Sequence, residues 1–389
     1  MRRLVFFAAV IGTCAAACAS TIFGFDAVSL APIPDASTER PDANLDGSSD
    51  VAPTGACGAP LGTSDNCAAC GHSCLGAACV DGGCETIPLL SGATNPAALV
   101  LDKGAVYIAT FDDVLRIDKE TNASFDVLRG GTRGAFIESL AVDESLVYWG
   151  ERQASTFACP KTGCPDAGGT RQGPAATNPI AIALAGGDLV WNDGLAARLF
   201  AVDRRTGQDT RALSSTLVRS RTLATDETAI YVPNGDDQAI LRIALDGGST
   251  TTLAHTTAPA TALTLVGSTV FFGASDGSLG VVRTNGGGAV AFAARTTSVA
   301  SLASDGNHIY WADRGTTAAN GQRQSDGCIY RCPLATCTVA KPTAVRCGLS
   351  TPTRIAVDEN AIYWTNLGPG MENDLPVSGS AAKMAKPPP

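Results

Sequence analysis

A ten-residue phrase that recurs seven times constrains this chain more than any other feature of its sequence. Successive copies begin 41, 42, 41, 40, 39 and 53 residues apart. A nearly constant period of about 40 residues, with strand-forming residues in every copy, is typical of a radially repeated all-β fold. The copies are Leu99–Ile108, Leu140–Trp149, Ile182–Trp191, Leu223–Val232, Leu263–Phe272, Leu302–Trp311 and Ile355–Trp364.

Each copy has the pattern of two strands joined by a tight turn. In Ile355–Trp364 apolar residues alternate up to Asp358, a polar turn follows, and β-branched and aromatic residues end the copy. Segments such as Ile240–Leu245 and Thr250–Leu253 supply a third and a fourth strand. We therefore predict an all-β, seven-bladed β-propeller of four-stranded antiparallel blades. Six blades is the alternative, because the third and fifth copies are less regular.

The last copy is too short to complete a blade. After Trp364 the sequence offers a third strand at Ala381–Ala385 but no fourth. We expect Glu85–Leu90, just before the first copy, to supply the missing strand and to cover an otherwise open sheet edge. The propeller would then occupy residues 85–386.

An aspartate stands at the fourth position of five copies, at the start of the turn. A ring of such carboxylates would suit a ligand, whereas a single Asp in a turn caps its own backbone. Because Gly, Ser, Thr or Asn accompanies the Asp in these turns, we favour the capping role. The residues are Asp102, Asp143, Asp226, Asp305 and Asp358.

The N-terminus has the pattern of an export signal at residues 1–18. Arg2 and Arg3 precede the apolar stretch Leu4–Thr13, which is too short to span a membrane as a helix. Three alanines before Cys18 resemble a bacterial lipobox, so we predict lipid attachment at Cys18, with cleavage at an Ala-x-Ala site as the alternative. Residues 19–56, rich in Pro, Asp and Ala, are predicted to be a disordered linker. We expect an outer-membrane or cell-surface lipoprotein, or otherwise a secreted protein, that contacts the membrane only through its lipid.

Cysteines support export, since twelve of the fourteen follow the signal segment and form an even set. Six of them fall within residues 57–84, where we predict a small module held by disulfides of undetermined pairing. Zinc is the alternative there, because Cys67, Cys70, His72 and Cys74 have ligand-like spacing. Disulfides are favoured behind an export signal, and His72 is then expected to be a solvated loop residue. The six cysteines are Cys57, Cys67, Cys70, Cys74, Cys79 and Cys84.

The other six cysteines lie inside the predicted blades. Two Cys-Pro-x-x-x-Cys segments bracket the turn between the third and fourth strands of the second and sixth blades. Cross-strand β-carbons at such a turn come within disulfide reach. A last bridge is expected across the ends of two paired strands in the sixth blade. The predicted bridges are Cys159–Cys164, Cys332–Cys337 and Cys328–Cys347.

Motifs of catalysis are scarce. The net charge of −9 argues against nonspecific binding to nucleic acid. The sequence has no Gly-x-Ser-x-Gly elbow, His-Glu-x-x-His motif or phosphate-binding glycine loop. His255 and His308, which fall in loops, have no partner recognisable from spacing and are interpreted as surface residues. We predict no cofactor, no metal site and no catalytic residue.

One candidate site follows from propeller topology. The loops that join strands two and three of each blade open on one face, together with the loops between blades, and we call this the loop face. Carboxylates occur there in six of the seven predicted blades, and arginines including Arg219 and Arg221 lie in the loops between blades. Such a surface would suit a polar ligand, a glycan, a divalent cation or a protein loop, although turns are polar in any case. The candidate ligand contacts are Asp112, Asp113, Glu151, Asp193, Asp236, Asp237, Asp276 and Asp313.

The copies that end in Val-Tyr-Trp or Ile-Tyr-Trp, together with Ile362–Asn366, resemble the repeats of YWTD- and NHL-type β-propellers. Joined to a Cys-rich segment such as Cys70–Cys74, they resemble predicted secreted lipoproteins of Gram-negative bacteria. The resemblance implies a binding module. We therefore expect a monomeric, non-enzymatic surface protein that binds a protein or a glycan at the loop face. The alternatives are a propeller hydrolase or lyase acting on an extracellular polymer or lactone, and a structural envelope protein.

Overall fold

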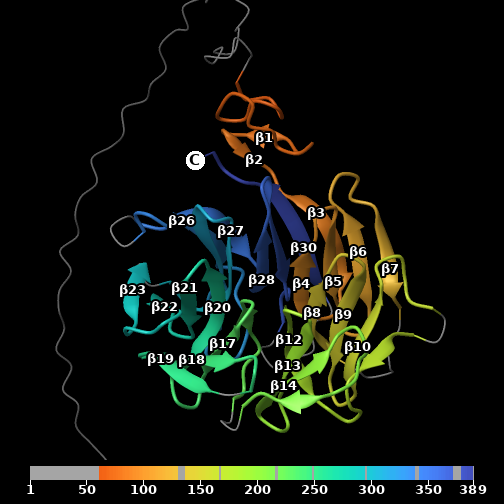
Figure 1. Ribbon diagram of the computed structural model, residues 1–389. Helices are drawn as coiled ribbons and strands as arrows, with labels where there is room; N and C mark the ends of the chain where they lie inside the picture. The colour runs from red at the N-terminus through yellow and green to blue at the C-terminus, as the bar shows by residue number, and fades with distance from the viewer. Residues whose placement is uncertain are drawn as a thin grey trace, which may run out of the picture. The chain divides into compact units, whose positions relative to one another are not determined.

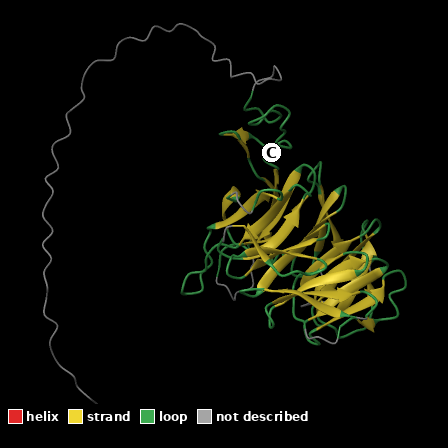
Figure 2. Cartoon of the chain, turned by 60° about the vertical axis from the view of Figure 1, so that its left-hand side comes forward, coloured by secondary structure: helices red, strands yellow, loops and turns green. Residues whose placement is uncertain are grey.

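The computed structural model describes residues 61–129, 136–165, 168–214, 218–247, 249–293, 296–337, 341–370 and 378–388. The predicted signal segment with Cys18, the linker 19–56 and Cys57 lie outside the described residues. Every regular element in the described ranges is a β-strand (Figures 1 and 2). These ranges contain no helix with the length and apolarity needed to cross a membrane.

Seven four-stranded antiparallel sheets follow one another around a central axis (Figure 1), which confirms the seven-bladed propeller. We number the blades 1 to 7 from the first repeat. Blade 1 is β4 (Ala98–Leu101), β5 (Ala105–Ala109), β6 (Val114–Asp118) and β7 (Ser124–Leu128). Blade 2 is β8 (Ile137–Val142), β9 (Leu146–Glu151), β10 (Ser155–Pro160) and β11 (Thr170–Gln172). Blade 3 is β12 (Pro179–Ala185), β13 (Asp188–Asp193), β14 (Arg198–Asp203) and β15 (Arg211–Ala212).

The remaining blades repeat this order, and the last one takes its outer strand from the N-terminal side. Blade 4 is β16 (Ala224–Thr225), β17 (Ala229–Asn234), β18 (Ala239–Ala244) and β19 (Thr250–His255). Blade 5 is β20 (Ala260–Val266), β21 (Thr269–Ala274), β22 (Leu279–Arg283) and β23 (Val290–Ala293). Blade 6 is β24 (Val299–Ser304), β25 (His308–Asp313), β26 (Gly327–Pro333) and β27 (Thr343–Leu349). Blade 7 is β28 (Pro352–Val357), β29 (Ala361–Asn366), β30 (Gly379–Ala385) and β3 (Ile87–Ala93).

The ring closes through β3. This strand pairs antiparallel with β30, with Ile87 opposite Lys383 and Ala93 opposite Gly379. The segment expected to close the ring at Glu85–Leu90 is thus part of β3, which begins at Ile87 and runs to Ala93. Pairing of these two distant segments removes the open edge that three strands alone would leave.

The aromatic ends of the repeated phrases fill the spaces between blades. Trp149, Trp191, Trp311 and Trp364 are at most 1% exposed. Three of these rings stack on an aromatic residue of the neighbouring strand in the same blade, at centroid distances of 5.5 to 5.9 Å. Large flat side chains at this register position therefore fill apolar space between neighbouring blades, as Trp149 and Trp191 do. This packing explains why an aromatic residue recurs there.

The repeated aspartates cap turns, as predicted. In each case Oδ1 accepts the backbone N–H groups of the residues two and three positions later, at 2.7 to 3.0 Å. The second oxygen accepts a hydrogen bond from the hydroxyl of the tyrosine five residues later, at 2.7 to 3.0 Å. One Asp thus fixes the turn and orients the buried Tyr of the second strand. The tyrosines are Tyr107, Tyr148, Tyr231, Tyr310 and Tyr363.

Four of these aspartates also hold the next blade, a role that sequence reasoning missed. A basic side chain directly after the third strand of one blade forms an ion pair with the Asp of the preceding blade. We call each such contact a staple. The staples are Lys161–Asp102 at 2.6 Å, Arg204–Asp143 at 3.7 Å, Lys386–Asp305 at 2.8 Å and Lys119–Asp358 at 2.8 Å. They link blades 1 to 2, 2 to 3, 6 to 7 and 7 to 1, on the face opposite the loop face.

Disulfides hold both the module and the blades. The three bridges expected within the propeller are present, between Cys159 and Cys164, Cys328 and Cys347, and Cys332 and Cys337. In the module, Cys67 bonds to Cys79, Cys74 bonds to Cys84, and Cys70 is also disulfide-bonded. These sulfur atoms are bonded to one another rather than available as thiolate ligands for zinc.

His72 is not the solvated loop residue that was expected. Its Nδ1 lies 2.6 Å from the carbonyl oxygen of Cys67, and its Nε2 lies 2.7 Å from the carbonyl oxygen of Lys386. The ring therefore joins the module, which contains β1 (Cys79–Val80) and β2 (Gly83–Cys84), to the residue that follows β30. Nothing in the sequence indicated this partner, because Lys386 lies 314 residues from His72 along the chain.

Candidate functional site

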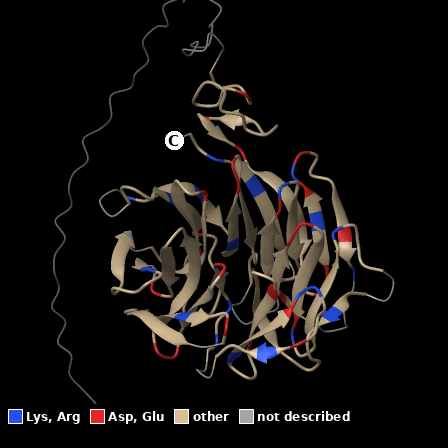
Figure 3. Cartoon of the chain, viewed as in Figure 1, with Lys and Arg blue, Asp and Glu red and all other residues tan. Residues whose placement is uncertain are grey.

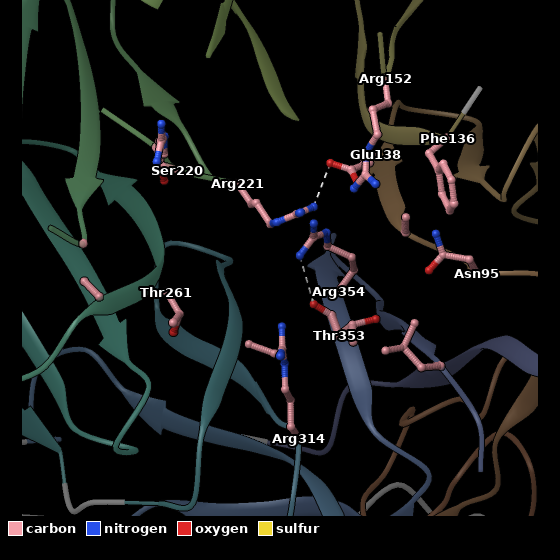
Figure 4. A pocket seen from close by; sticks show the side chains of 16 residues that line it. Asn95, Phe136, Glu138, Arg152, Ser220, Arg221, Thr261, Arg314, Thr353 and Arg354 are labelled. Carbon is pink, nitrogen blue, oxygen red and sulfur yellow. Dashed lines mark hydrogen bonds and ion pairs between the residues drawn. The ribbon is translucent and has the colours of Figure 1, made fainter. Parts of the chain in front are cut away.

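A cavity of about 630 Å³ opens on the loop face, near the central axis. The first residues of inner strands line it, together with residues that directly follow the second strands and residues of the loops between blades. The interpretation that these loops converge on one face therefore agrees with the structure. The charged lining residues are Glu138, Arg152, Arg221, Arg314 and Arg354, which are labelled in Figure 4, and Arg219.

The lining is strongly positive, although the chain as a whole is acidic. It contains five arginines and one carboxylate, an excess of four positive charges, in a protein with a net charge of −9. Charged residues are spread over other parts of the described chain with both signs interspersed (Figure 3). Like charges gathered in one concave site repel one another, so such a cluster favours binding of an anion.

Four separate parts of the chain bring these arginines together. Arg152 follows β9 in blade 2, and Arg314 follows β25 in blade 6. Arg219 and Arg221 lie in the connection from blade 3 to blade 4, and Arg354 belongs to inner strand β28. Their convergence depends on closure of the ring, because more than 200 residues separate Arg152 from Arg354.

Glu138, on inner strand β8, is 6% exposed and is held by two arginines. Its Oε1 accepts a hydrogen bond from Arg152, and its Oε2 accepts one from Arg221 Nη1 at 2.7 Å. Arg152 also lies over the ring of Phe136, with its guanidinium carbon 4.7 Å from the ring centroid. One carboxylate thus receives one donor on each oxygen, a charge-assisted geometry that arginine supplies well.

Arg354 lies beside this group, and its positive charge is balanced less fully than those of Arg152 and Arg221. Its guanidinium donates a long hydrogen bond of 3.4 Å to the carbonyl of Thr353. Burial, followed by the positive charges of Arg314 and Arg221, lowers the pKa of Arg354 to about 10, against a smaller opposing effect of Glu138. The unfavourable surroundings of this cation would be relieved by a second negative charge in the cavity.

None of the eight carboxylates predicted as ligand contacts lines this cavity. Glu151, Asp193 and Asp313 end their second strands and are 2 to 4% exposed. Glu151 accepts the indole N–H of Trp149, whereas Asp193 and Asp313 accept backbone N–H groups of loops beside them. Each of the three is occupied in fixing the loop face rather than pointing into its cavity.

Three of the remaining candidates make local contacts. Asp276 accepts the backbone N–H and the hydroxyl of Ser278, and Asp237 accepts the side-chain N–H of Asn234. The backbone carbonyl of Asp113 accepts the N–H of Thr110. Asp112 and Asp236 lie in the corresponding loops of blades 1 and 4 and are likewise absent from the lining.

Strand alternation explains why arginines, rather than the predicted carboxylates, line this cavity. Successive side chains of a strand point to opposite sides, so the residue after a predicted carboxylate can point into the cavity when the carboxylate itself does not. Thus Arg152 follows Glu151 and Arg314 follows Asp313, and each arginine lines the cavity. A second signal lies two residues before each phrase, where six of seven residues line the cavity. The seven are Ala97, Glu138, Ile180, Arg221, Thr261, Ala300 and Thr353, with Ile180 as the exception.

A larger cavity of about 1160 Å³ lies on the opposite face, beside Leu75 of the module. Its lining carries six carboxylates and four lysines, so positive charge is not in excess there. Lys119 and Lys386 form staples there, and the ammonium of Lys383 donates to the carbonyl of Lys119 at 2.6 Å. We therefore place the candidate ligand site at the smaller cavity, where positive charge is in excess.

Comparisons with known proteins indicate the fold. No protein-family profile matches the chain, and no curated protein is found as a relative. Among solved structures, a catalytically inactive virginiamycin B lyase from Staphylococcus aureus, crystallised with quinupristin, has 16% identity and a TM-score of 0.59, covering 77% of this chain and 98% of its own. A streptogramin B lyase has 13% identity and a TM-score of 0.58, with 77% and 97% covered. The WD40 repeats of RRP9 have 10% identity and a TM-score of 0.56, with 77% and 100% covered.

These likenesses establish a β-propeller fold that other proteins use for different tasks. Lyases and WD40 repeat proteins share the architecture with this chain at 10 to 16% identity. One fold hosts many activities, so the residues of the cavity must decide the function.

Proposed function

We propose that the protein is a non-enzymatic, extracytoplasmic binding module whose loop-face cavity holds an anionic ligand. The observation that supports this proposal is the excess of four positive charges around one cavity of an acidic protein. An anion entering this cavity relieves repulsion among the arginines and forms charge-assisted hydrogen bonds.

Of the two expected partners, the size of the cavity favours an acidic glycan over a protein. A volume of about 630 Å³ is within the roughly 300–1,000 Å³ typical of small-ligand sites. A stable protein partner would instead cover about 800 Å² on each side, usually around aromatic anchors. The lining contains one aromatic residue, Phe136, and Arg152 covers its ring.

Binding is better supported than the alternative, a hydrolase or lyase. Among the described residues that line the cavity, Glu138 is the one carboxylate, and none is a histidine. Both oxygens of that carboxylate accept hydrogen bonds from arginines, whereas a general base must lie within hydrogen-bond reach of a substrate proton.

An extracytoplasmic location, with a lipid on Cys18 as the membrane anchor, belongs to the same proposal. Its support is the export-like residues 1–18 and five disulfides within the described part of the chain, since such bonds persist in oxidising compartments. Metabolic labelling with a fatty acid should mark the wild-type protein and not Cys18→Ser. Equal labelling of both proteins would refute the anchor.

The ligand proposal is tested by calorimetric titration of the purified monomer with oligosaccharides of matched length. An oligomer of galacturonic acid should bind and a neutral glucose oligomer should not, with affinity falling as salt rises. A sulfated oligosaccharide and a glutamate oligopeptide identify other acidic ligands. Failure of every anionic probe to bind in low salt would refute the proposal.

A further inference from the structure

The cavity already contains one bound carboxylate, and it belongs to the protein. Glu138 accepts a hydrogen bond from Arg152 on one oxygen and from Arg221 on the other, at 2.7 Å for the second. Its side chain is 7% exposed, while those of Arg152 and Arg221 are 34% and 59% exposed. The buried acid is thus covered by two arginines that remain open to solvent.

A second group of cations lies next to Glu138 and the two arginines that hold it. Arg354 comes from the inner strand of blade 7 and Arg314 from the loop of blade 6, and their side chains point into the same opening (Figure 4). These four groups, Arg221, Arg314, Arg354 and Glu138, line the same cavity, and the charges of the other three act on Arg354. Glu138 is the one carboxylate among the described lining residues, against five arginines.

We infer that Glu138 is an internal counter-ion. It occupies the carboxylate-binding position formed by Arg152 and Arg221, while a carboxylate of the ligand binds beside Arg354. This inference rests on the proposed function and deepens it by naming the ligand class, a glycan that carries carboxylates. When a ligand carries carboxylates on adjacent residues, one binds beside Arg354 and the next competes with Glu138 for Arg152 and Arg221. The protein therefore limits its own affinity through one buried acid.

A clear ranking of variants follows. Glu138→Gln removes the negative charge and frees two arginines, so the affinity for a galacturonic acid oligomer should rise about tenfold. Arg354→Gln removes the cation proposed to bind the ligand carboxylate and should lower the affinity about tenfold or more. Arg221→Gln removes a cation that Glu138 already holds and should cost less than about threefold.

The experiment measures these affinities by calorimetry in low salt, with the full chain and galacturonic acid oligomers as the probe. Arg283→Gln serves as the control, because Arg283 is an exposed residue on β22 and does not line the cavity. Melting temperatures of all variants identify any that lose the fold. If Glu138→Gln fails to fold, the comparison between Arg354→Gln and Arg221→Gln decides the inference by itself.

The outcomes separate this inference from the proposed function. Tighter binding by Glu138→Gln together with a loss confined to Arg354→Gln supports the internal counter-ion. Unchanged or weaker binding by folded Glu138→Gln overturns it, as do equal losses for Arg354→Gln and Arg221→Gln. In either case the proposed function stands as long as the wild-type protein binds the acidic oligomer. Binding of the sulfated oligosaccharide with no binding of the carboxylated one would keep the anion site and overturn the ligand class.

Discussion

Replacement of Asp102 by Asn tests whether the repeated aspartates hold the ring together. Asp102 receives the backbone N–H groups of Gly104 and Ala105 on one oxygen, and the hydroxyl of Tyr107 and the ammonium of Lys161 on the other. The Asn side chain keeps the size of the group but loses its charge. The turn of blade 1 and its staple to blade 2 should therefore weaken together.

The size of the effect follows from the pKa of this carboxyl group. Burial by itself would raise the pKa of Asp102, but hydrogen bonds from Lys161, Gly104, Tyr107 and Ala105 lower it from 3.8 to about 2. A shift of one unit corresponds to about 1.4 kcal/mol. Since the side chain is 20% exposed and solvent screens part of the interaction, we expect Asp102→Asn to lower the free energy of unfolding by about 2 kcal/mol at pH 7.

The sign of the pH dependence follows from the same shift. The pKa of Asp102 is lower in the folded protein than in the unfolded chain. Its stabilising contribution is therefore complete above the unfolded value and is lost as the pH falls from about 4 toward about 2. The difference between wild type and Asp102→Asn should accordingly be constant at neutral pH and shrink over this acidic range.

Urea unfolding at several pH values, followed by tryptophan fluorescence with the disulfides intact, measures this difference. Asp203→Asn is the matched control, because Asp203 caps an exposed turn and forms no staple. Its loss should be smaller than that of Asp102→Asn. Lys161→Met should lose stability without a further loss when combined with Asp102→Asn, as expected of two partners in one contact. A difference that persists undiminished at pH 2, or equal losses for Asp102→Asn and Asp203→Asn, would refute the reasoning.

Three further predictions concern packing and closure. Gly280→Ala should lower the free energy of unfolding by about 1–3 kcal/mol, because an added Cβ would lie 2.4 Å from the Phe272 ring, whereas Gly104→Ala, with no atom within 4 Å, should be tolerated in the same urea assay. Removal of the Cys328–Cys347 bridge, which spans 19 residues, with serine at both positions should cost about 3 kcal/mol in thermal unfolding; an unchanged melting temperature would contradict this. His72→Ala should expose the module to limited proteolysis while the propeller keeps its melting temperature, and unchanged protease resistance would show that the contact to Lys386 is dispensable.

Much of the fold was predictable because its signals are local or repeated. The phrase Ile355–Trp364 places a turn between two strands, and β28 and β29 form there, with Ile355 opposite Trp364. The closing strand was expected at residues 85–90 because the last copy lacked a fourth strand, and β3 covers residues 87–93. The bridge between Cys328 and Cys347 followed from antiparallel pairing of two strands, in which these residues lie opposite each other.

The candidate site was harder to predict, because its residues come together only when the ring closes. Glu138 and Arg221 stand 83 residues apart, and nothing near either residue in the sequence names the other as its partner. The long loop Ala312–Gly327 in blade 6 contributes one described residue, Arg314, to the lining of the cavity. Much of the loop folds on itself through a bridge between Thr317 and Arg323, and Arg323 donates its backbone N–H to Gly370.

Repetition itself distinguishes the two classes of residue. A carboxylate that recurs at one register position in five copies needs an explanation that applies five times, and the Asp turn with its Tyr hydroxyl gives one. Six of the seven residues two positions before each phrase line the cavity, but these residues do not share a chemistry. Small or uncharged side chains stand there in five copies, and Glu138 and Arg221 in the other two. The fold of a blade demands neither charge, so the positions where a repeat departs from its own pattern are those where a function can be sought.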